Sequence, residues 1–268
     1  MLARQRQATI LDRVRTAGGV RVTELAAEFG VSDMTIRRDL DTLHDQGLLA
    51  KVHGGATVTD PGSTDEPGFH AKSVRQAAEK AAIATRAAEL VRPGAAVALS
   101  AGTTTAELAR RLVDVPGLTV VTNSLPVAEI LHTAGRPDQT VVLTGGVRTP
   151  SDALVGPLAV EAIRSLHLDL LFLGVHGITE RAGFTTPNLM EAETDRALVE
   201  AADRLVVLAD HTKWGTVGIS SIVGLGAADV LVSDDRLAPE ARRVIDEKVG
   251  ELVIVTGTGR VAGRGTTR

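Results

Sequence analysis

The chain has 268 residues, 44% hydrophobic but only 2% aromatic, so Leu, Val, Ile and Ala must fill a core of appreciable size. The absence of cysteine excludes disulfides, thiolate nucleophiles and cysteine-based zinc sites, and it fits a reducing, cytoplasmic compartment. A net charge of −4 excludes a general polyanion binder, and the sequence contains neither a bilayer-spanning apolar run nor a signal peptide, so we expect no membrane contact.

Three helices are expected at the N-terminus. The first runs from Leu2 to about Thr16, with Ile10 and Val14 on its apolar face, and ends at Gly18-Gly19. Thr23 can cap a short second helix, and Ser32 can cap a third over residues 33–46. Two helices joined by a tight glycine-containing turn predict a helix-turn-helix.

The third helix separates into two faces. Ile36, Leu40 and Leu43 share one side and predict contact with the core, which leaves the polar side free. A recognition helix needs this arrangement, because arginine reaches guanine edges or phosphates from the free side. The residues that we expect to contact DNA lie in its first half: Ser32, Thr35, Arg37 and Arg38.

Residues 48–58 read as a β-hairpin around Gly54-Gly55, and a hairpin after a recognition helix is a wing. Lys51 and His53 are placed to contact the DNA backbone or minor groove. Residues 1–58 carry eight Lys or Arg and seven Asp or Glu, which supports DNA binding only mildly. The alternative is a small helical interaction domain in which Arg37 and Arg38 are simply solvated.

Residues 59–71 hold Pro, Gly, Ser and acidic residues and predict a linker, and residues 257–268 predict a disordered tail. Between them, residues 72–256 alternate helices with short apolar runs, which indicates strands buried on both faces of a mostly parallel sheet in an α/β domain. The helix that follows the linker is expected over Ala71–Val91. The expected strands are Ala95–Leu99, Leu118–Val121, Thr140–Leu143, Leu168–Leu173, Arg204–Leu208, Asp229–Val232 and Leu252–Val255.

Polar loops follow three of these strands. After the first strand, Gly102 precedes a helix that opens with Thr103, Thr104 and Thr105, where free N–H groups and the helix dipole favour an anion. Asn123 and Ser124 follow the second strand, and Gly145 follows the third. Because ligands bind at the carboxyl ends of strands in open parallel sheets, the three loops can converge on one site. A capped helix without a ligand is the plainer interpretation of the first loop alone.

Two charged residues further along are candidates for the same site. Glu191 lies early in a helix, and Lys213 follows a strand that ends at Asp210, where a lysine suits a phosphate or carboxylate. Otherwise Glu191 favours its own helix N-terminus and Lys213 is a solvated loop charge. His176 and His211 have no paired ligand pattern, so we expect no metal and no cofactor.

The stretch LAAEFGVSDMTIRRDLDTLHDQGLLAKVHGGA closely resembles the DNA-binding signature of the DeoR family of bacterial repressors. Residues from about 72 to 256 resemble the sensor domain of that family through the ordered segments EKAAIA, AGTTTAELA, LTVVTNSL, LTGG, LVGP, DLLFLGVHGI, EAETDRALVEAA and LADHTKWG.

The resemblance implies a sensor domain with a fold like that of ribose-5-phosphate isomerases and glucosamine-6-phosphate deaminases, which binds a phosphorylated sugar or related metabolite. Gly102–Thr105 would then hold the phosphate. The remaining pocket residues implied are Asn123, Ser124, Gly145, Glu191 and Lys213.

Three positions depart from the family pattern: Lys51 stands where Arg is frequent, Ser100 where Asp is frequent and Asp195 where Lys is common. A phosphate contact tolerates Lys for Arg better than a bidentate base contact does. The other two departures affect which sugar would bind.

Three functions are compatible with these features. The first is a repressor of carbohydrate genes, a homo-dimer or homo-tetramer that binds an operator in double-stranded DNA and responds to a phosphorylated sugar. The second is a sugar-phosphate isomerase or deaminase with an appended DNA-binding module, with Glu191 as the candidate base. Against catalysis, residues 174–177 read Gly-Val-His-Gly where the related isomerases carry an acidic cluster, so we expect no catalytic residue. The third is a DNA-binding protein with a ligand-free oligomerisation core.

Overall fold

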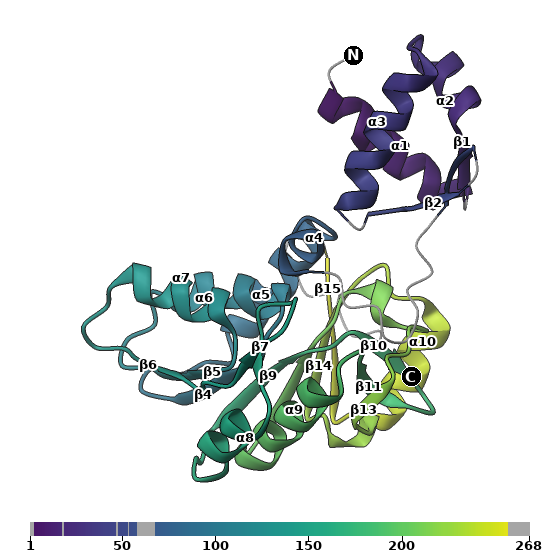
Figure 1. Ribbon diagram of the computed structural model, residues 1–268. Coiled ribbons are helices and arrows are strands. Elements are labelled where there is room, and N and C mark those ends of the chain that lie inside the picture. The colour runs from purple at the N-terminus through teal and green to yellow at the C-terminus, as the bar shows by residue number, and fades with distance from the viewer. Residues whose placement is uncertain (1–2, 18, 47, 53, 58–67, 257–268) are drawn as a thin grey trace. The chain divides into compact units, whose positions relative to one another are not determined.

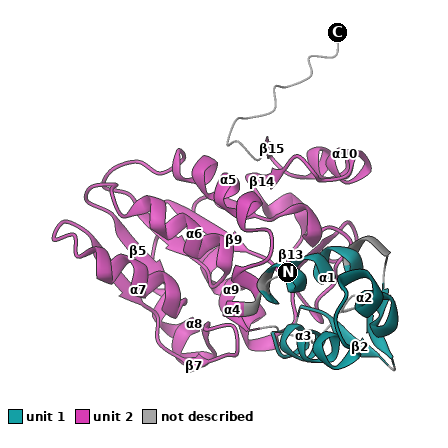
Figure 2. Cartoon of the chain, turned by 90° about the horizontal axis from the view of Figure 1, so that it is seen from above, with its two compact units in different colours: residues 1–62 teal, residues 63–268 magenta. Residues whose placement is uncertain are grey.

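The computed structural model describes residues 3–17, 19–46, 48–52, 54–57 and 68–256. The chain divides into two compact units, residues 1–62 and residues 63–268, which Figure 2 colours separately. Most of the expected linker, His53 of the expected wing and the expected tail over 257–268 lie outside the described residues. Phe69, His70 and Ala71, which we assigned to the linker, instead begin a short helix, so that assignment was wrong at its end.

The N-terminal unit is a helical bundle with a small antiparallel sheet of order β1-β3-β2. Its elements are α1 (Ala3–Ala17), β1 (Gly19–Arg21), α2 (Val22–Phe29), α3 (Asp33–Asp45), β2 (Ala50–Val52) and β3 (Gly55–Thr57). The expected helices and hairpin are confirmed, but β1 was not predicted and adds a third strand through the pairing of Val20 with Ala56. The bundle with its hairpin is a winged helix-turn-helix.

Local signals explain most of these boundaries. Gly30 takes a left-handed conformation (φ 62°) and ends α2, and the Ser32 hydroxyl accepts a hydrogen bond from the Thr35 amide to begin α3. The expected cap at Thr23 is wrong, because α2 begins at Val22 and its N-cap is Arg21, two residues earlier, which makes no side-chain cap. Ile10, Val14, Ile36, Leu40 and Leu43 form the buried core of the unit, as their spacing predicts.

The C-terminal unit is built on a seven-stranded sheet of order β15-β14-β12-β9-β4-β5-β6, all of whose pairings are parallel (Figure 1). Every one of the seven expected strands is present in it. These strands are β4 (Ala96–Leu99), β5 (Thr119–Thr122), β6 (Thr140–Leu143), β9 (Leu170–Gly174), β12 (Leu205–Leu208), β14 (Val230–Asp234) and β15 (Glu251–Val255).

The other elements of this unit cover or extend the sheet. The helices are α4 (Phe69–Ser73), α5 (Ala77–Ala88), α6 (Thr103–Leu112), α7 (Leu125–Ala134), α8 (Pro157–Arg164), α9 (Leu189–Ala201) and α10 (Pro239–Lys248), with the short helices η1 (His211–Lys213) and η2 (Leu225–Ala227). The small strands are β7 (Val147–Arg148), β8 (Leu154–Val155), β10 (Gly177–Thr179), β11 (Gly183–Thr186) and β13 (Ser220–Val223).

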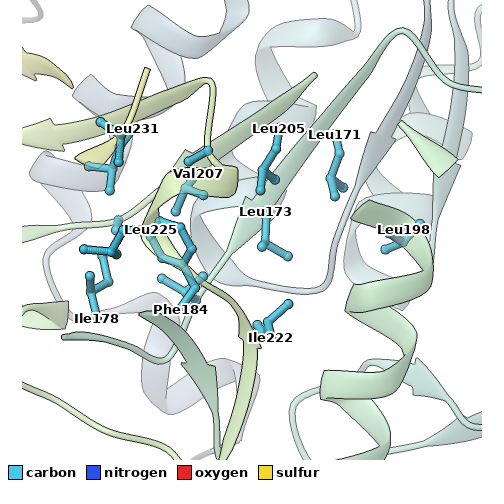
Figure 3. Close-up of a cluster of buried hydrophobic side chains, with 14 of the residues drawn as sticks. Leu171, Leu173, Ile178, Phe184, Leu198, Leu205, Val207, Ile222, Leu225 and Leu231 are labelled. Carbon is cyan, nitrogen blue, oxygen red and sulfur yellow. The ribbon is translucent and has the colours of Figure 1, made fainter. Parts of the chain in front are cut away.

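Alternate residues of each central strand supply two separate cores. In β9, Leu170 and Phe172 pack with α5, α6 and α7 on one face. Leu171 and Leu173 point to the opposite face, where Leu198 of α9 and Phe184 of β11 join them (Figure 3). The result is a three-layer α/β/α sandwich whose strands are apolar on both sides because both sides are covered.

Two expectations about this unit were wrong. The β6 strand is not buried on both faces, since Val142 and Leu143 are exposed. The reason is that β6 lies at the edge of the sheet. The continuous helix expected over residues 71–91 is divided into α4 and α5 by Gln76, a non-glycine residue in the left-handed region (φ 47°, ψ 41°). Among the described residues, no helix is both long and apolar enough to cross a bilayer.

Candidate functional site

The recognition helix α3 presents two arginines. Arg37 and Arg38 are both exposed, and within the described part of the chain neither forms an ion pair. Ser32 and Thr35 lie at the N-terminus of the helix, with their hydroxyl oxygens 3.0 Å apart. The structure thus brings these four residues together on one exposed end of α3, which suits contact with a polyanion.

Met34 is a residue of this surface that the sequence interpretation missed. Its side chain is 60% exposed in the first turn of α3, between polar neighbours. The only sequence signal is a large apolar residue outside the spacing of Ile36, Leu40 and Leu43. An apolar side chain here can contact a thymine methyl group in the major groove.

The wing is held against α3 by an ion pair. Lys51 in β2 pairs with Asp41 of α3, so its ammonium group already has a carboxylate partner while remaining about half exposed. His53, the other residue expected to contact DNA from the wing, lies outside the described residues.

In the C-terminal unit the strand order changes direction between β4 and β9. The chain proceeds outward from β4 through β5 to β6, then returns to β9 on the other side of β4. Ligands of open α/β sheets bind at the carboxyl ends of the strands at such a switch point. The loops that leave β4 and β9 meet there, and the Ser100 hydroxyl accepts a hydrogen bond from the Gly174 amide at 3.0 Å.

The Gly102–Thr105 loop begins α6 at this point. Gly102 is the N-cap and provides no side-chain cap, so N–H groups of the first turn remain available at the positive end of the helix dipole. Thr103 is half-buried, whereas Thr104 and Thr105 are buried and the Thr105 hydroxyl donates to the Gly102 carbonyl at 2.9 Å. A Cβ on Gly102 would lie 3.1 Å from the Thr105 hydroxyl oxygen, which favours glycine at this position.

The loops after β5 and β6 are arranged differently from each other. Asn123 is fully buried and connects two loops, since its Oδ1 accepts from the Ala101 amide at 2.8 Å and its Nδ2 donates to the Leu154 carbonyl at 3.3 Å. Ser124 is the buried N-cap of α7. Gly145 has a φ of 73°, and a Cβ placed on it would meet no atom within 4 Å. Asn123 and Ser124 therefore hold the backbone of the loops at the carboxyl edge of the sheet, and Gly145 leaves space beside them.

Lys80 is the most informative residue that the sequence interpretation missed. It lies in α5, is only 6% exposed, and its ammonium group donates to the carbonyl oxygens of Lys72 and Arg75 at 2.5 and 2.7 Å. Burial lowers the pKa of Lys80 to about 8, with Asp210 opposing the shift and Lys213 adding to it. A helical lysine is usually solvated, so only its place in the EKAAIA segment could have indicated its burial.

Lys213 lies close enough to Lys80 for the two charges to interact. It ends the short helix η1, which the buried Asp210 begins by accepting a hydrogen bond from the Thr212 amide at 3.0 Å. Burial favours the neutral form of Asp210, but Lys213, the Thr212 hydroxyl and Lys80 outweigh it, so the pKa of Asp210 is lowered. The charges of Lys80 and Lys213 therefore both act on the carboxylate of Asp210.

Asp234 fixes the position of the Lys213 loop. Its carboxylate accepts from the His211 amide at 2.7 Å and faces the His211 ring nitrogen Nδ1 at 2.9 Å. Because Asp234 ends β14 and Asp210 follows β12, two neighbouring strands hold this loop. Within the described residues, no cluster of three or more His, Cys, Asp and Glu side chains is suited to a metal ion.

Glu191 and Asp195 lie one turn apart on α9. Glu191 is half-buried and accepts a hydrogen bond from the Thr186 hydroxyl at 2.9 Å, while Asn188 caps the helix before it. Asp195 is buried, and burial followed by the charge of Glu191 raises the pKa of Asp195 well above its usual value. Glu191 is thus hydrogen-bonded to β11, and Asp195, one turn further along the helix, favours its neutral, protonated form.

Comparison with known proteins assigns both units. The profile described as the DeoR-like helix-turn-helix domain matches residues 6–61, and the one described as the DeoR C terminal sensor domain matches residues 75–235. The chain belongs to the DeoR family.

Curated relatives of this DeoR-family protein match along nearly their whole length. GlpR, an HTH-type transcriptional regulator of Haloferax volcanii, is 37% identical over 97% of this chain and 100% of its own. GolR, an HTH-type transcriptional regulator of Listeria innocua, is 36% identical over 87% and 91%. The glycerol-3-phosphate regulon repressor of Escherichia coli K12 is 31% identical over 86% and 90%. The chain is therefore a DNA-binding transcriptional regulator and not a sugar-phosphate isomerase or deaminase.

Solved structures match about half of this chain and about half of their own length. Ribose 5-phosphate isomerase A of Methanocaldococcus jannaschii matches with a TM-score of 0.37 and 17% identity, covering 50% of this chain and 53% of that one. The translation initiation factor eIF-2B of Pyrococcus horikoshii matches with a TM-score of 0.40 and 18% identity, covering 56% and 52%.

Proposed function

We propose that this DeoR-family regulator represses carbohydrate genes and is controlled by a phosphorylated sugar bound at the carboxyl edge of its seven-stranded sheet. The observation that carries the proposal is the pair of ammonium groups, Lys80 and Lys213, on the same sheet edge as the N-terminus of α6. Cationic side chains and a helix N-terminus are the groups that proteins use to bind phosphate.

The phosphate would occupy the positive end of α6. Amides of the Gly102–Thr105 turn and the Thr103 hydroxyl would donate to its oxygens, and Lys213 would supply charge from the loop after β12 at the same edge of the sheet. An anion bound near Lys80 and Lys213 would also be attracted by both ammonium groups, which repel each other. The binding of a dianion would therefore relieve a repulsion that already exists within the unit.

The sugar would extend from the phosphate toward the loops after β5 and β6. Gly145 leaves room there, Asn123 and Ser124 hold the adjoining backbone, and the Glu191 carboxylate can accept hydrogen bonds from hydroxyl groups. One relative is named as the repressor of a glycerol-3-phosphate regulon, which supports a small phosphorylated metabolite as the ligand class.

On the DNA side, α3 would enter the major groove. Arg37 and Arg38 would reach guanine edges or phosphates, Ser32 and Thr35 would contact the backbone, and Met34 would pack on a thymine methyl group. Lys51, and His53 by its position in the sequence, would meet the flanking backbone from the wing. A homo-dimer or homo-tetramer would place such helices on two half-sites of a palindromic operator.

Control would follow from linkage between the two ligands. Effector shifts the DNA-competent population only if it binds one arrangement of the oligomer better than the other. Lys80 connects the proposed phosphate site to the α4–α5 corner, since its ammonium group holds the carbonyl oxygens of Lys72 and Arg75. That corner is the first described structure after the linker, so it is the natural route to the DNA-binding unit.

A thermal-shift screen of phosphorylated sugars against their non-phosphorylated parents tests the proposal. We expect one or more sugar phosphates to raise the melting temperature, and the parent sugars to have no effect. Each hit is then added to a gel shift on the DNA upstream of the chain's own gene, where it should change the bound fraction. If no sugar phosphate shifts the melting temperature, the C-terminal unit is an oligomerisation core without an effector, and the proposal fails.

A further inference from the structure

The recognition helix contains acidic residues beside its two arginines. Asp39 directly follows Arg38, and Asp41 lies two positions further on. A carboxylate close to an arginine competes with phosphate for it and repels the DNA backbone. The position of these carboxylates therefore affects whether the two arginines can bind DNA.

Asp39 is removed from the DNA-facing side by two residues of α1. Its Oδ2 lies 2.5 Å from Nε of Arg6, and its Oδ1 accepts a hydrogen bond from Nε2 of Gln7 at 3.0 Å. Arg6 is 8% exposed and Asp39 is 4% exposed, so the ion pair lies within the unit. Both oxygens of one carboxylate are thus occupied by neighbouring side chains of one helix.

This arrangement fixes the rotation of α3 about its own axis. The apolar contacts of Ile36, Leu40 and Leu43 are non-directional and would tolerate a small rotation, whereas a carboxylate bound at both oxygens would not. Successive residues of an α-helix are about 100° apart around the axis. With Asp39 turned toward α1, Arg38 and Arg37 are directed away from it, where both are exposed.

We propose that Asp39, clamped by Arg6 and Gln7, is a positioning residue for operator recognition. It sets the orientation in which Arg37 and Arg38 are presented, and it removes its own negative charge from their reach. This inference rests on the proposed function of α3 as the helix that reads DNA. A buried ion pair is weak evidence for stability, because desolvation offsets its Coulomb energy, whereas it has attested roles in fixing register and orientation.

The test compares selective with non-selective DNA binding. The probes are the duplex that the parent chain enriches from a randomised library and a scrambled duplex of equal length and composition. The variants are Asp39→Asn, which keeps the shape but loses the charge, and Arg6→Lys, which keeps the charge but loses the Nε contact. Arg13→Ala is the matched control, since it breaks the exposed Arg13–Glu28 ion pair in the same unit.

We expect Asp39→Asn and Arg6→Lys to lower the ratio of the two affinities at least tenfold, and Arg13→Ala to leave it within twofold. A purely structural role would reduce the folded fraction and weaken binding to both duplexes equally, so the ratio would not change. A ratio within twofold of the parent value in both variants overturns the inference.

Two further variants test whether the pair variants fail only because they do not fold, and whether α3 reads DNA at all. Arg6→Met/Asp39→Leu replaces the pair by apolar side chains that keep the contact between α1 and α3, and circular dichroism checks its helix content. Folded protein that retains the parent ratio overturns the inference, and a lowered ratio supports it. If Arg38→Ala also keeps full selectivity, α3 does not read DNA and the proposed function fails. If Arg38→Ala loses selectivity while the folded pair variants keep it, the positioning role alone fails.

Discussion

The ammonium group of Lys80 lies 2.7 Å from the carbonyl oxygen of Arg75, at the corner between α4 and α5. The same group is buried, and its electrostatic partners include Asp210 and Lys213 of the proposed phosphate site. The Lys80 side chain therefore contacts the junction of α4 and α5 and also interacts with the candidate ligand site. The protonation state of Lys80 should consequently affect both.

Effector binding should weaken as pH rises through about 8. The pKa of Lys80 is lowered to about 8 mainly by burial, so the side chain is charged at pH 7 and largely neutral at pH 9. An anion favours the charged form, and its affinity is lost as that form disappears. We expect affinity about tenfold weaker at pH 9 than at pH 7, since one proton is linked to binding over this interval. Isothermal titration calorimetry at several pH values measures it.

Lys80→Met is the control for this pH dependence. The variant should bind the effector more weakly at pH 7 and should show a nearly flat affinity between pH 7 and 9. An unchanged pH dependence in Lys80→Met would assign the titrating group to another residue.

Lys213→Ala should weaken the effector response and leave DNA binding intact. The substitution removes one of the two ammonium groups that face Asp210, and a charge-assisted contact to an anion contributes about 1.5–3 kcal/mol. We therefore expect an effector affinity roughly 10- to 150-fold lower, measured by thermal shift over a ligand titration. Lys248→Ala, which removes a lysine paired with Glu180 on the surface, should behave like the parent. A parent-like response in Lys213→Ala would remove this residue from the site.

Arg38→Ala should weaken selective operator binding and leave the effector-induced thermal shift unchanged. Loss of one bidentate base contact costs about 1–3 kcal/mol, which corresponds to roughly 5- to 150-fold in affinity. Because Arg38 is exposed and forms no ion pair with the described residues, its removal should not alter the melting temperature. Gel shifts with and without competitor DNA check the first expectation. Operator affinity equal to that of the parent would contradict the role of α3.

Gly55→Ala should destabilise the N-terminal unit more than Gly54→Ala. A Cβ on Gly55 would lie 2.0 Å from the Val20 carbonyl oxygen, so β1 and β3 could not stay paired, and such crowding costs at least about 1–3 kcal/mol. A Cβ on Gly54 meets no atom within 4 Å, and the cost of its left-handed backbone is about 1–2 kcal/mol. Urea denaturation followed by circular dichroism ranks the two. The reverse order would contradict the contact between β1 and β3.

The sequence predicted the main sheet well because its strands are apolar on both faces and stand out as unbroken runs. The runs around Val97, Val120 and Val206 all became strands of the parallel sheet. The small strand β1 was missed because Gly19-Val20-Arg21 is too short to carry a pattern, and its partner β3 lies far along the chain. The break at Gln76 was missed because a glutamine gives no local sign of a left-handed backbone.

The candidate site was less accessible to sequence reasoning than the fold. The turn at Gly102–Thr105 and the lysine at position 213 could be predicted as candidates because they follow apolar runs. Lys80 was not, because its burial depends on packing against a strand and a loop more than a hundred residues away. The ion pair between Arg6 and Asp39 likewise joins two helices, and no spacing within either one reveals it.

The break at Gln76 changes what the segment after the linker can transmit. A continuous helix over residues 71–91 would transmit any tilt of its first turn to the sheet that it covers. Two short helices that meet at Gln76 do not share one axis, so a change in the direction of α4 is not transmitted rigidly to α5, whose apolar residues pack in the core. The Lys80 ammonium group donates to two carbonyl oxygens at that junction, so we expect an anion bound beside Lys80 to change these hydrogen bonds and, with them, the angle between α4 and α5.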